Sequence, residues 1–289
     1  MADSFGLRGN VISRRRFAFL LLPLLLGVPG AAQTLRVMSF NVRLPTPGDG
    51  PNIWDKRRDV LVETIRLKDP DLMGTQELFS LQGQYIVEKL PQYTWFGISR
   101  RGNTQDEHMG VFYKRDKLTL LDSGNFWLSE TPEQPGSMSW NVSLPRMVTW
   151  GLFQIVGTSR RFYYYNTHFP HRAEDAAARL ECAKVIAARL KALPPDVPFI
   201  MTGDFNAQLG EEVYQVFAGT LRDAYREAPK KSGPETTMSQ WTAREKGNRI
   251  DWILYRGNLK AQEFETVTYN QDGRYPSDHY PVFTVIGLE

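Results

Sequence analysis

The sequence predicts an α/β protein of the α+β type, in which mainly antiparallel sheets carry helices on their outer faces. Short β-like runs alternate with a few helical stretches, and many of these runs follow one another along the chain, which is typical of antiparallel sheets. The 289 residues are 42% apolar, which is enough for a sizeable core and excludes a wholly disordered chain. No repeat, low-complexity tract or change in composition divides residues 33–289, so we expect one domain there.

Residues 1–32 are predicted to be an export signal that is removed from the mature protein. Three arginines, Arg14 to Arg16, precede an uncharged apolar run, and small residues up to Ala32 form a cleavage site. A membrane anchor is the less favoured alternative, because Pro23 interrupts the run and the run is short for a membrane span. The Ser-Arg-Arg-x-Phe order resembles a twin-arginine signal, with an ordinary secretory signal as the alternative. We therefore expect a bacterial protein exported to the periplasm or beyond the cell, with no membrane span in its mature chain.

The export signal also accounts for the positive charge of the chain. Residues 1–32 contain four of the 35 Lys and Arg residues and one of the 32 Asp and Glu residues. Residues 33–289 therefore have 31 basic and 31 acidic side chains, a formal net charge of zero. Contacts to backbone phosphates supply most of the nonspecific affinity of a nuclease, so a neutral chain favours a smaller substrate. The single cysteine, Cys182, cannot form an internal disulfide and is expected to be a small packed side chain.

Hydrophobic periodicity predicts the strands and helices in turn. Residues 35–40 alternate like a half-buried strand, whereas residues 55–68 and 172–191 have apolar side chains at helical spacing. Residues 44–52 and 129–139 are predicted loops because turn-forming residues are concentrated there. The core face predicted for the second helix is Ala176, Leu180, Ala183, Ala187 and Leu190. The other predicted strands are residues 71–75, 93–98, 109–114, 149–156, 161–167, 197–202, 249–255, 262–269 and 281–286.

Polar residues with catalytic chemistry stand at the ends of these predicted strands. A lone acid or histidine there is usually a turn, cap or structural hydrogen-bonding residue. Asp251 is different, because burying an acid inside an apolar strand is costly unless the acid is paired. As a set, the residues suit metal-assisted hydrolysis of a phosphate ester, with oxygen ligands for Mg²⁺ or Mn²⁺ and an Asp–His pair as a base. The set is Asn41, Glu77, His168, Asp204, Asn206, Asp251, Asp278 and His279.

Six motifs in a fixed order carry a family resemblance. They are Ser-Phe-Asn-Val at 39–42, Gln-Glu at 76–77, Asn-Thr-His at 166–168, Gly-Asp-Phe-Asn at 203–206, Arg-Ile-Asp-Trp-Ile at 249–253 and Ser-Asp-His-Tyr-Pro at 277–281. Together they resemble the endonuclease/exonuclease/phosphatase superfamily over nearly all of residues 35–287. The resemblance implies a four-layered sandwich of two packed, mainly antiparallel sheets flanked by helices. It also implies a phosphoesterase that depends on a divalent metal, Mg²⁺ or Mn²⁺.

The resemblance implies a role for each matched residue. Asn41 and Glu77 would hold the metal, with Asp278 close to it. Asp204 would position or activate the attacking water, and Asn206 would help to hold the phosphate oxygens. His279, oriented by Asp251, would act as the base or stabilise the transition state, and His168 would contact the phosphate or help the leaving oxygen depart. The sequence leaves open whether Asp204 or His279 is the base.

Residues around these motifs bear on the substrate. Arg43 replaces an acid found in the abasic-site endonucleases of the superfamily, and an arginine binds a phosphate oxygen rather than a cation. Trp54 with Arg57-Arg58, residues 126–129 and Pro145-Arg146 resemble a secreted bacterial subgroup. Arg57 and Arg146 are candidate phosphate ligands, with surface salt bridges as the alternative. Trp127, Trp140 and Trp241 are candidates for a cleft wall, although aromatic residues are more often core, and His171 is expected to be a rim or helix-cap residue.

The leading hypothesis is therefore an exported hydrolase of phosphate esters, whose substrate is a small molecule or a lipid head group. A secreted endonuclease acting on DNA or RNA is the alternative. A noncatalytic binding protein is less favoured because the metal and base residues are all present. No stable protein partner is implied.

Overall fold

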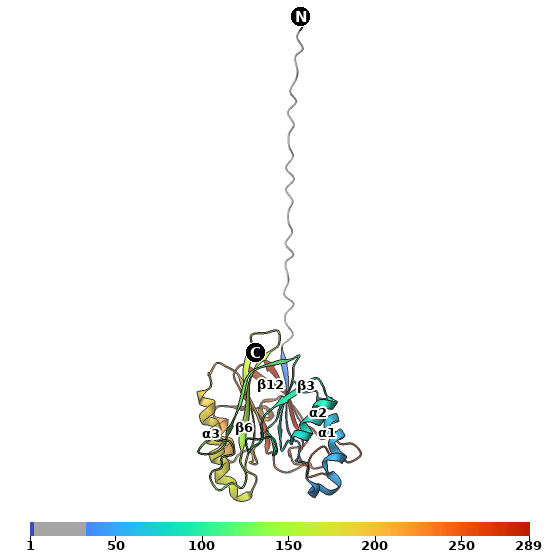
Figure 1. The fold of residues 1–289 in the computed structure, drawn as a ribbon, viewed down its shortest axis with the longest axis vertical. Coiled ribbons are helices and arrows are strands. Elements are labelled where there is room, and N and C mark those ends of the chain that lie inside the picture. The colour runs from blue at the N-terminus through green and yellow to red at the C-terminus, as the bar shows by residue number, and fades with distance from the viewer. Residues whose placement is uncertain (3–32) are drawn as a thin grey trace. The chain divides into compact units, whose positions relative to one another are not determined.

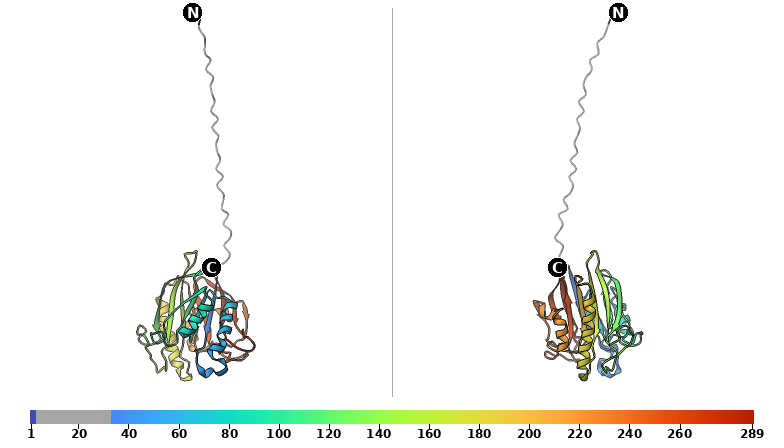
Figure 2. Two further views of the ribbon diagram at one scale, coloured as in Figure 1. Left: turned by 45° about the vertical axis from the view of Figure 1, so that its right-hand side comes forward. Right: turned by 90° about the vertical axis from the view of Figure 1, so that its left-hand side faces the viewer.

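Two mixed β-sheets pack face to face and carry helices on their outer faces in the computed structural model, which describes residues 1–2 and 33–289 (Figure 1). Helices α1 (Trp54–Lys68) and α2 (Ser80–Lys89) lie on one side of the sandwich and α3 (Ala176–Ala192) on the other. The two views of Figure 2 bring these sides forward in turn. The predicted fold class is therefore confirmed. The predicted export segment falls outside the described residues, apart from its first two.

The first sheet has the strand order β10-β12-β13-β1-β2-β4-β3. β1 and β2 run parallel, as do β10 and β12, and the other neighbours are antiparallel. The expectation of a half-buried β1 is wrong, because its residues from Val37 onward are all buried between α1 and α2 on one face and the second sheet on the other. The bounds are β1 Thr34–Asn41, β2 Leu72–Gln76, β3 Tyr93–Phe96, β4 Val111–Lys114, β10 Lys230–Ser232, β12 Leu259–Thr266 and β13 Val282–Leu288.

The second sheet has the strand order β5-β6-β7-β8-β11-β9, with β7 and β8 parallel and the other neighbours antiparallel. The periodicity did not predict β5, although it is ten residues long. β5 is an edge strand whose exposed middle contains Asp122 and Ser123, followed by the half-buried Gly124, so it has no regular apolar pattern there. The bounds are β5 Leu118–Trp127, β6 Met147–Ile155, β7 Arg161–His168, β8 Phe199–Asp204, β9 Arg222–Asp223 and β11 Asp251–Arg256.

The helix α3 packs on the second sheet through a face that overlaps the predicted one in part, because Ala183 and Leu190 are buried there as predicted. Cys182, Ala183 and Ile186 are fully buried there with residues of β7 and β8, and the packed role predicted for Cys182 is confirmed. Ala176 is exposed, so its predicted place in the core is wrong. The remaining short helices are η1 (Pro47–Asn52), η2 (Ala173–Asp175), α4 (Glu212–Ala218) and α5 (Ala224–Glu227). Within the part of the chain that the structure describes, no helix combines the length and apolarity needed to cross a membrane.

A buried polar bridge joins the two sheets inside an otherwise apolar core. Gln76 Nε2 donates to Asn166 Oδ1 over 2.7 Å, and Thr202 Oγ1 donates to the same oxygen over 3.0 Å. Asn166 Nδ2 in turn donates to the backbone carbonyl of Thr75 over 2.8 Å. These side chains are fully buried, so their mutual hydrogen bonds offset part of the cost of burying polar groups, while Gln76 Oε1 has no hydrogen-bond partner among the described residues. Gln76 directly precedes Glu77, and Asn166 and Thr202 each lie two residues before a predicted site residue.

Candidate active site

Strand direction and register bring the predicted residues to one edge of the sandwich. β7 and β8 are parallel and end side by side, with His168 in register with Asp204. β11 runs antiparallel to β8 and begins there, with Asp251 in register with Asp204 on its other side. In the first sheet, β1 ends at Asn41 beside the end of β2, which Glu77 follows. The loop before β13 places Asp278 and His279 at the same edge, because β13 starts where β1 ends.

This edge encloses a cavity of about 380 Å³. Its lining residues include all but two of the predicted site residues: Asn41 and Asp251 lie behind the wall and hydrogen-bond to residues that line it. The lining residues are Arg43, Leu44, Glu77, Arg100, Glu107, Leu144, Arg146, His168, His171, Asp204, Asn206, Met238, Asp278 and His279.

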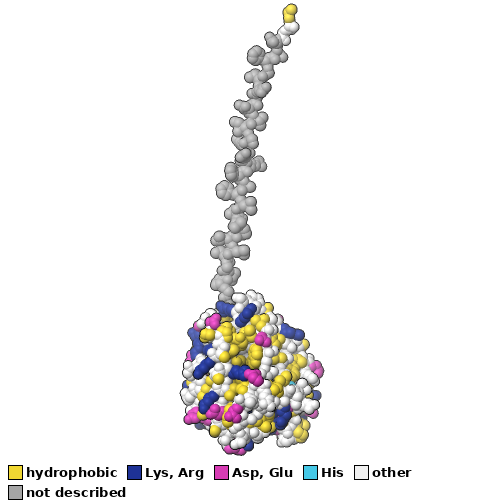
Figure 3. All heavy atoms as spheres, turned by 60° about the vertical axis from the view of Figure 1, so that its left-hand side comes forward, with side chains coloured by type: hydrophobic (Ala, Val, Ile, Leu, Met, Phe, Trp, Pro, Cys, Tyr) yellow, Lys and Arg dark blue, Asp and Glu magenta, His cyan; other side chains and the backbone are white. Residues whose placement is uncertain are grey.

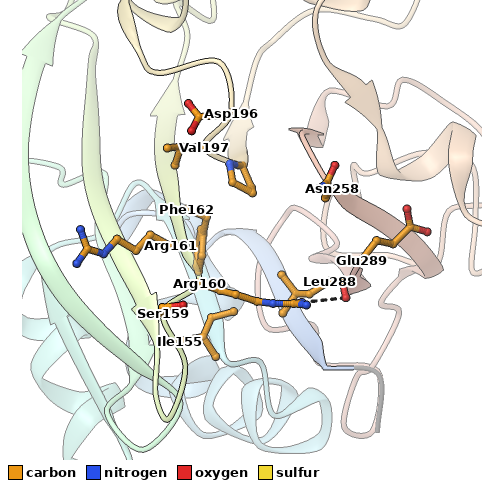
Figure 4. Close-up of a pocket in the computed structure, with 11 residues that line it drawn as sticks. Ile155, Ser159, Arg160, Arg161, Phe162, Asp196, Val197, Asn258, Leu288 and Glu289 are labelled. Carbon is orange, nitrogen blue, oxygen red and sulfur yellow. Dashed lines mark hydrogen bonds between the residues drawn. The ribbon is translucent and has the colours of Figure 1, made fainter. Parts of the chain in front are cut away.

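Another cavity, of about 410 Å³, lies at the opposite ends of the same strands (Figure 4). It is found where Arg161 begins β7 and Leu288 ends β13, and the guanidinium of Arg160 donates there to the carbonyl of Leu288 over 3.1 Å. None of the predicted site residues lines it. The candidate catalytic chemistry therefore belongs to the cavity at the Asp204 edge.

One wall of the catalytic cavity carries oxygen ligands. Asn41 Nδ2 donates to Glu77 Oε1 over 3.1 Å and to Asp204 Oδ2 over 3.0 Å, and so links the two sheets. The backbone N–H of Leu44 donates to Glu77 Oε2 over 3.1 Å. Burial alone would raise the pKa of Glu77, but the charge of His279 and the Leu44 hydrogen bond outweigh it and lower that pKa. Burial raises the pKa of Asp278. The Glu77 carboxylate is thus held in its charged form, as a cation ligand requires.

The guanidinium of Arg43 lies between these acids. Its Nη1 is 3.7 Å from Glu77 Oε2 and 3.8 Å from Asp278 Oδ2, and its Nε and Nη2 donate to Asp49. The hydrogen bonds to Asp49 raise the pKa of Arg43. The chemistry of this donor set fits a divalent ion, because oxygen atoms from two acids converge on a place that already attracts positive charge. Glu77 and Asp278, with Asn41 behind them, would hold the ion.

Asp204, Asp251 and His279 also have the residue types of a metal site, and one ligand atom from each lies within 4.8 Å of the others. His279 Nδ1 is already hydrogen-bonded to Asp251 Oδ2 over 3.0 Å, and His279 Nε2 is 3.8 Å from Asp204 Oδ2. This geometry resembles a histidine held by one acid and directed at another. The oxygen-only set of Glu77 and Asp278 suits a hard cation better.

The two acid–base candidates, Asp204 and His279, both have raised pKa values, for different reasons. Burial, reinforced by the neighbouring charge of Asp251, raises the pKa of Asp204 to about 7. Burial alone would lower the pKa of His279, but the carboxylates of Asp251 and Asp204 outweigh it and hold that pKa well above its usual value. At neutral pH, Asp204 is therefore poised to accept a proton, whereas His279 is a cation that donates hydrogen bonds.

His168 and Asn206 complete the cavity beside Asp204. His168 Nε2 lies 3.4 Å from Asp204 Oδ2, and burial with the nearby charge of Arg146 lowers the pKa of His168 well below its usual value. His168 is therefore neutral and has one ring N–H to donate. Asn206 donates its backbone N–H to Asp204 Oδ1 and its side-chain amide to the carbonyl of Phe169.

Three cavity residues have left-handed backbone conformations. Arg43, Glu77 and Asn206 have φ angles of 55°, 57° and 47°. This region costs a non-glycine residue about 1 kcal/mol or more, so it persists only where the surroundings enforce it. The two sharp turns that follow β1 and β2 aim Arg43 and Glu77 into the same cavity wall, and the strain therefore coincides with the candidate site.

Several predictions for the flanking residues are corrected. Arg57 is not a phosphate ligand: it is fully buried, and its guanidinium donates to the backbone carbonyls of Asn52, Val42, Pro276 and Arg43 over 2.7–3.0 Å. Burial lowers the pKa of Arg57 to about 10. Arg57 therefore braces the loop that carries Arg43.

The aromatic cleft wall is also corrected. Trp127 is buried, and its indole N–H donates to the carbonyl of Arg100 over 2.6 Å. Trp140 and Trp241 are half-buried and do not line the catalytic cavity. His171 is exposed and lines the cavity, as expected of a rim residue.

Sequence reasoning missed Asp49, Arg100 and Glu107. Arg100 Nη1 is 2.7 Å from Glu107 Oε2, and burial, with the charge of Glu77, raises the pKa of Glu107 to about 7. Arg100 and Glu107 bracket a turn-rich segment between β3 and β4, and Asp49 lies in η1. None of them stands at the end of a strand, so the signal that located the other residues does not apply to them.

The two-sheet fold and the acids and histidines at one edge define a class of protein, that of the phosphoesterases and nucleases. Residues 38–279 match the sequence model of the Endonuclease/Exonuclease/phosphatase family. The chain belongs to this family, whose members are divalent-metal-dependent and generally hydrolyse phosphate esters.

Similar structures and relatives agree with this assignment. An endonuclease/exonuclease/phosphatase family protein from Bacteroides thetaiotaomicron is 31% identical, with a TM-score of 0.84 over 89% of this chain and 98% of that chain. A mannosyl-6-phosphatase from the same organism is also 31% identical, with a TM-score of 0.81 over 87% of this chain and 99% of that chain. Nocturnin from Xenopus laevis is 25% identical over 280 residues, which are 86% of this chain and 70% of that protein.

Proposed function

We propose that the protein is an exported hydrolase of phosphate esters that depends on Mg²⁺ or Mn²⁺. The observation that carries this proposal is the placement of Asp204 among Asn41, His168 and His279, within 3.0–3.8 Å of each, in the cavity that Glu77 and Asp278 also line. A proton acceptor, two histidines and a pair of cation ligands in one cavity are the components of metal-assisted attack by water on phosphorus.

In this proposal each residue acts on one part of the reaction. Asp204 accepts the proton of the attacking water, because a base works best when its pKa is near the working pH. His279, kept charged by Asp251, donates a hydrogen bond to the phosphoryl oxygens as their charge grows. His168 and Asn206 donate to the phosphate or to the leaving oxygen, and Arg43 and Arg146 bind phosphate oxygens. The divalent ion, when bound by Glu77, Asp278 and Asn41, supplies positive charge for the same oxygens.

A small phosphorylated molecule or lipid head group is the favoured substrate. The chain without residues 1–32 is formally neutral, and on the face in Figure 3 the basic and acidic side chains are interspersed. A nucleic-acid groove requires concentrated positive charge. The similarity to a mannosyl-6-phosphatase also favours a small substrate. A nuclease acting on DNA or RNA is the second candidate because the family includes nucleases, and faster nicking of a plasmid than hydrolysis of any small ester would favour it.

Substitution of Glu77 tests the metal site directly. Glu77→Gln keeps the shape of the side chain but removes its charge, so Mn²⁺ binding measured by calorimetry is expected to weaken about 10–100-fold. Hydrolysis of p-nitrophenyl phosphate by the unaltered protein should stop when EDTA is added and return with Mg²⁺ or Mn²⁺. Glu88→Gln, which alters an exposed acid of α2, is the control and should bind Mn²⁺ normally. Equal Mn²⁺ affinities for the unaltered protein and Glu77→Gln would contradict the assignment.

Export is tested by fractionating bacterial cells that produce the full chain. We expect the enzyme in the periplasm or medium, and Arg14→Lys with Arg15→Lys should retain it in the cytoplasm by removing the paired arginines of the signal. Arg8→Lys, outside the pair, is the matched control and should not change export. An unaltered chain that stays in the cytoplasm would refute this part of the proposal.

A further inference from the structure

We propose that the catalytic cavity selects phosphate monoesters over diesters, and that the buried side chain of Arg146 provides this selectivity. The inference rests on the proposed function, because it names the substrate class of the same cavity. A monoester presents a terminal phosphoryl group with three nonbridging oxygens and up to two negative charges. A diester presents two nonbridging oxygens and one charge.

Arg146 is a buried cation with donors to spare. It stands directly before β6, is 3% exposed and lines the cavity. Its Nη2 donates a hydrogen bond to Nδ1 of His171 over 3.0 Å. Its Nε and Nη1 are buried and have no hydrogen-bond partner among the described residues. Leaving a charged donor buried and unpaired is costly, so an acceptor-rich anion is the expected partner for these two nitrogens.

The other arginines of the cavity differ from Arg146 because each has a carboxylate partner, although Nε of Arg100 is also buried without a hydrogen-bond partner among the described residues. Arg43 is paired with Asp49, and Arg100 is paired with Asp106 and Glu107, at 2.7–3.0 Å. Within residues 33–289, no carboxylate oxygen lies within 4.0 Å of the Arg146 guanidinium. The charge of Arg146 therefore lacks a direct counterion, whereas the charges of Arg43 and Arg100 each have one.

The shape of the guanidinium suits a terminal phosphoryl group. Nη2 carries two N–H groups, and the one that His171 does not use forms a planar fork with Nε or with Nη1, which binds two oxygens of a phosphate at once. A monoester that fills this fork has a third nonbridging oxygen left for the acid–histidine and carboxylate side of the cavity. In a diester that position carries a second carbon substituent, which cannot accept a charge-assisted hydrogen bond and leaves one fewer charge to compensate.

The reaction balances without a co-reactant. The oxygen of water forms a bond to phosphorus, and the bond between phosphorus and the ester oxygen breaks. The electron pair of that bond goes to the leaving oxygen, which takes one of the two water protons. The products are an alcohol and inorganic phosphate, and Arg146 holds the same two oxygens before and after the reaction.

The test compares two esters in one preparation of the full-length protein with Mn²⁺. The unaltered enzyme should have a higher kcat/KM for p-nitrophenyl phosphate than for bis(p-nitrophenyl) phosphate. Arg146→Met should lower kcat/KM for the monoester about 100-fold, the effect expected for one charge-assisted pair. The fold-loss in kcat/KM for the diester should be at least ten times smaller. For the monoester, the kcat/KM of Arg146→Lys should lie between that of the unaltered enzyme and that of Arg146→Met, because lysine keeps the charge but lacks the fork. The ratio of the two rates does not depend on the folded fraction, so partial misfolding does not affect the comparison.

Binding of inorganic phosphate gives a readout without catalysis. Calorimetry should show phosphate affinity at least ten times weaker in Arg146→Met, and unchanged in Arg160→Met, which alters an arginine at the far cavity. Faster hydrolysis of the diester, or equal losses on both esters, would overturn the inference. If neither ester is hydrolysed, the proposed function fails, and phosphate affinity still decides: unchanged affinity in Arg146→Met overturns the role of Arg146, and weakened affinity supports it.

Discussion

Asp204→Asn is expected to lower kcat for phosphate ester hydrolysis by about 10³-fold, within the range for loss of a general base. The substitution keeps the size of the side chain but removes the proton acceptor, and it turns an amide toward Asn41 and His279, which both face Asp204 Oδ2. KM should change far less than kcat, because Asp204 acts on the attacking water rather than on the bound ester. Steady-state rates on p-nitrophenyl phosphate with saturating Mn²⁺ measure both constants.

Asp223→Asn is the matched control for this experiment. Asp223 is also a buried aspartate of the second sheet, and its pKa is also raised by burial. It contacts Tyr214 and the backbone of Tyr225 rather than the cavity. A kcat that falls equally in both variants would mean that the loss reflects packing of the sheet, and Asp204 would not be the base.

Asp251→Asn is expected to lower kcat by about 10⁴-fold through His279, as loss of the acid that orients a catalytic histidine does. Asp251 Oδ2 lies 3.0 Å from His279 Nδ1, and its charge is the largest cause that raises the pKa of His279. Removing that charge lowers the pKa of His279, so the imidazole becomes neutral at a lower pH and loses a donor proton.

The pH dependence separates this role from a structural one. In Asp251→Asn the decline of kcat on the alkaline side should begin at a lower pH than in the unaltered enzyme, so that part of the activity returns as the pH is lowered. Asp223→Asn, one strand away from Asp251 in the same sheet, should keep the original profile. An unshifted alkaline limb in a folded Asp251→Asn protein would mean that Asp251 does not act through His279.

Much of the site could be predicted from sequence because it is assembled from strand ends. Apolar strands are easy to recognise, and a polar residue at the end of one is marked by its position. In the structure, the parallel pairing of β1 with β2 and of β7 with β8 brings Asn41 close to Glu77, and His168 close to Asp204. The central strands of both sheets were located for the same reason.

The remaining features depend on tertiary contacts that no local pattern records. Arg57 has the same sequence appearance as a surface arginine, but carbonyl groups of four separate residues surround it, and one of them is 219 positions away. Arg100 and Glu107 gain their place only because their segment folds back along the cavity. β5 was missed because an edge strand does not need an apolar middle.

The polar bridge between the sheets has a consequence for mechanical precision. Contacts between apolar side chains have no preferred direction, so two sheets held by them alone would slide past each other at little cost. The energy of a hydrogen bond depends on its distance and angle. The hydrogen bond from Gln76 to Asn166 crosses the interface between the two sheets next to Glu77 and His168. The bridge therefore keeps Glu77, which follows a strand of the first sheet, aligned with His168 and Asp204, which end two strands of the second.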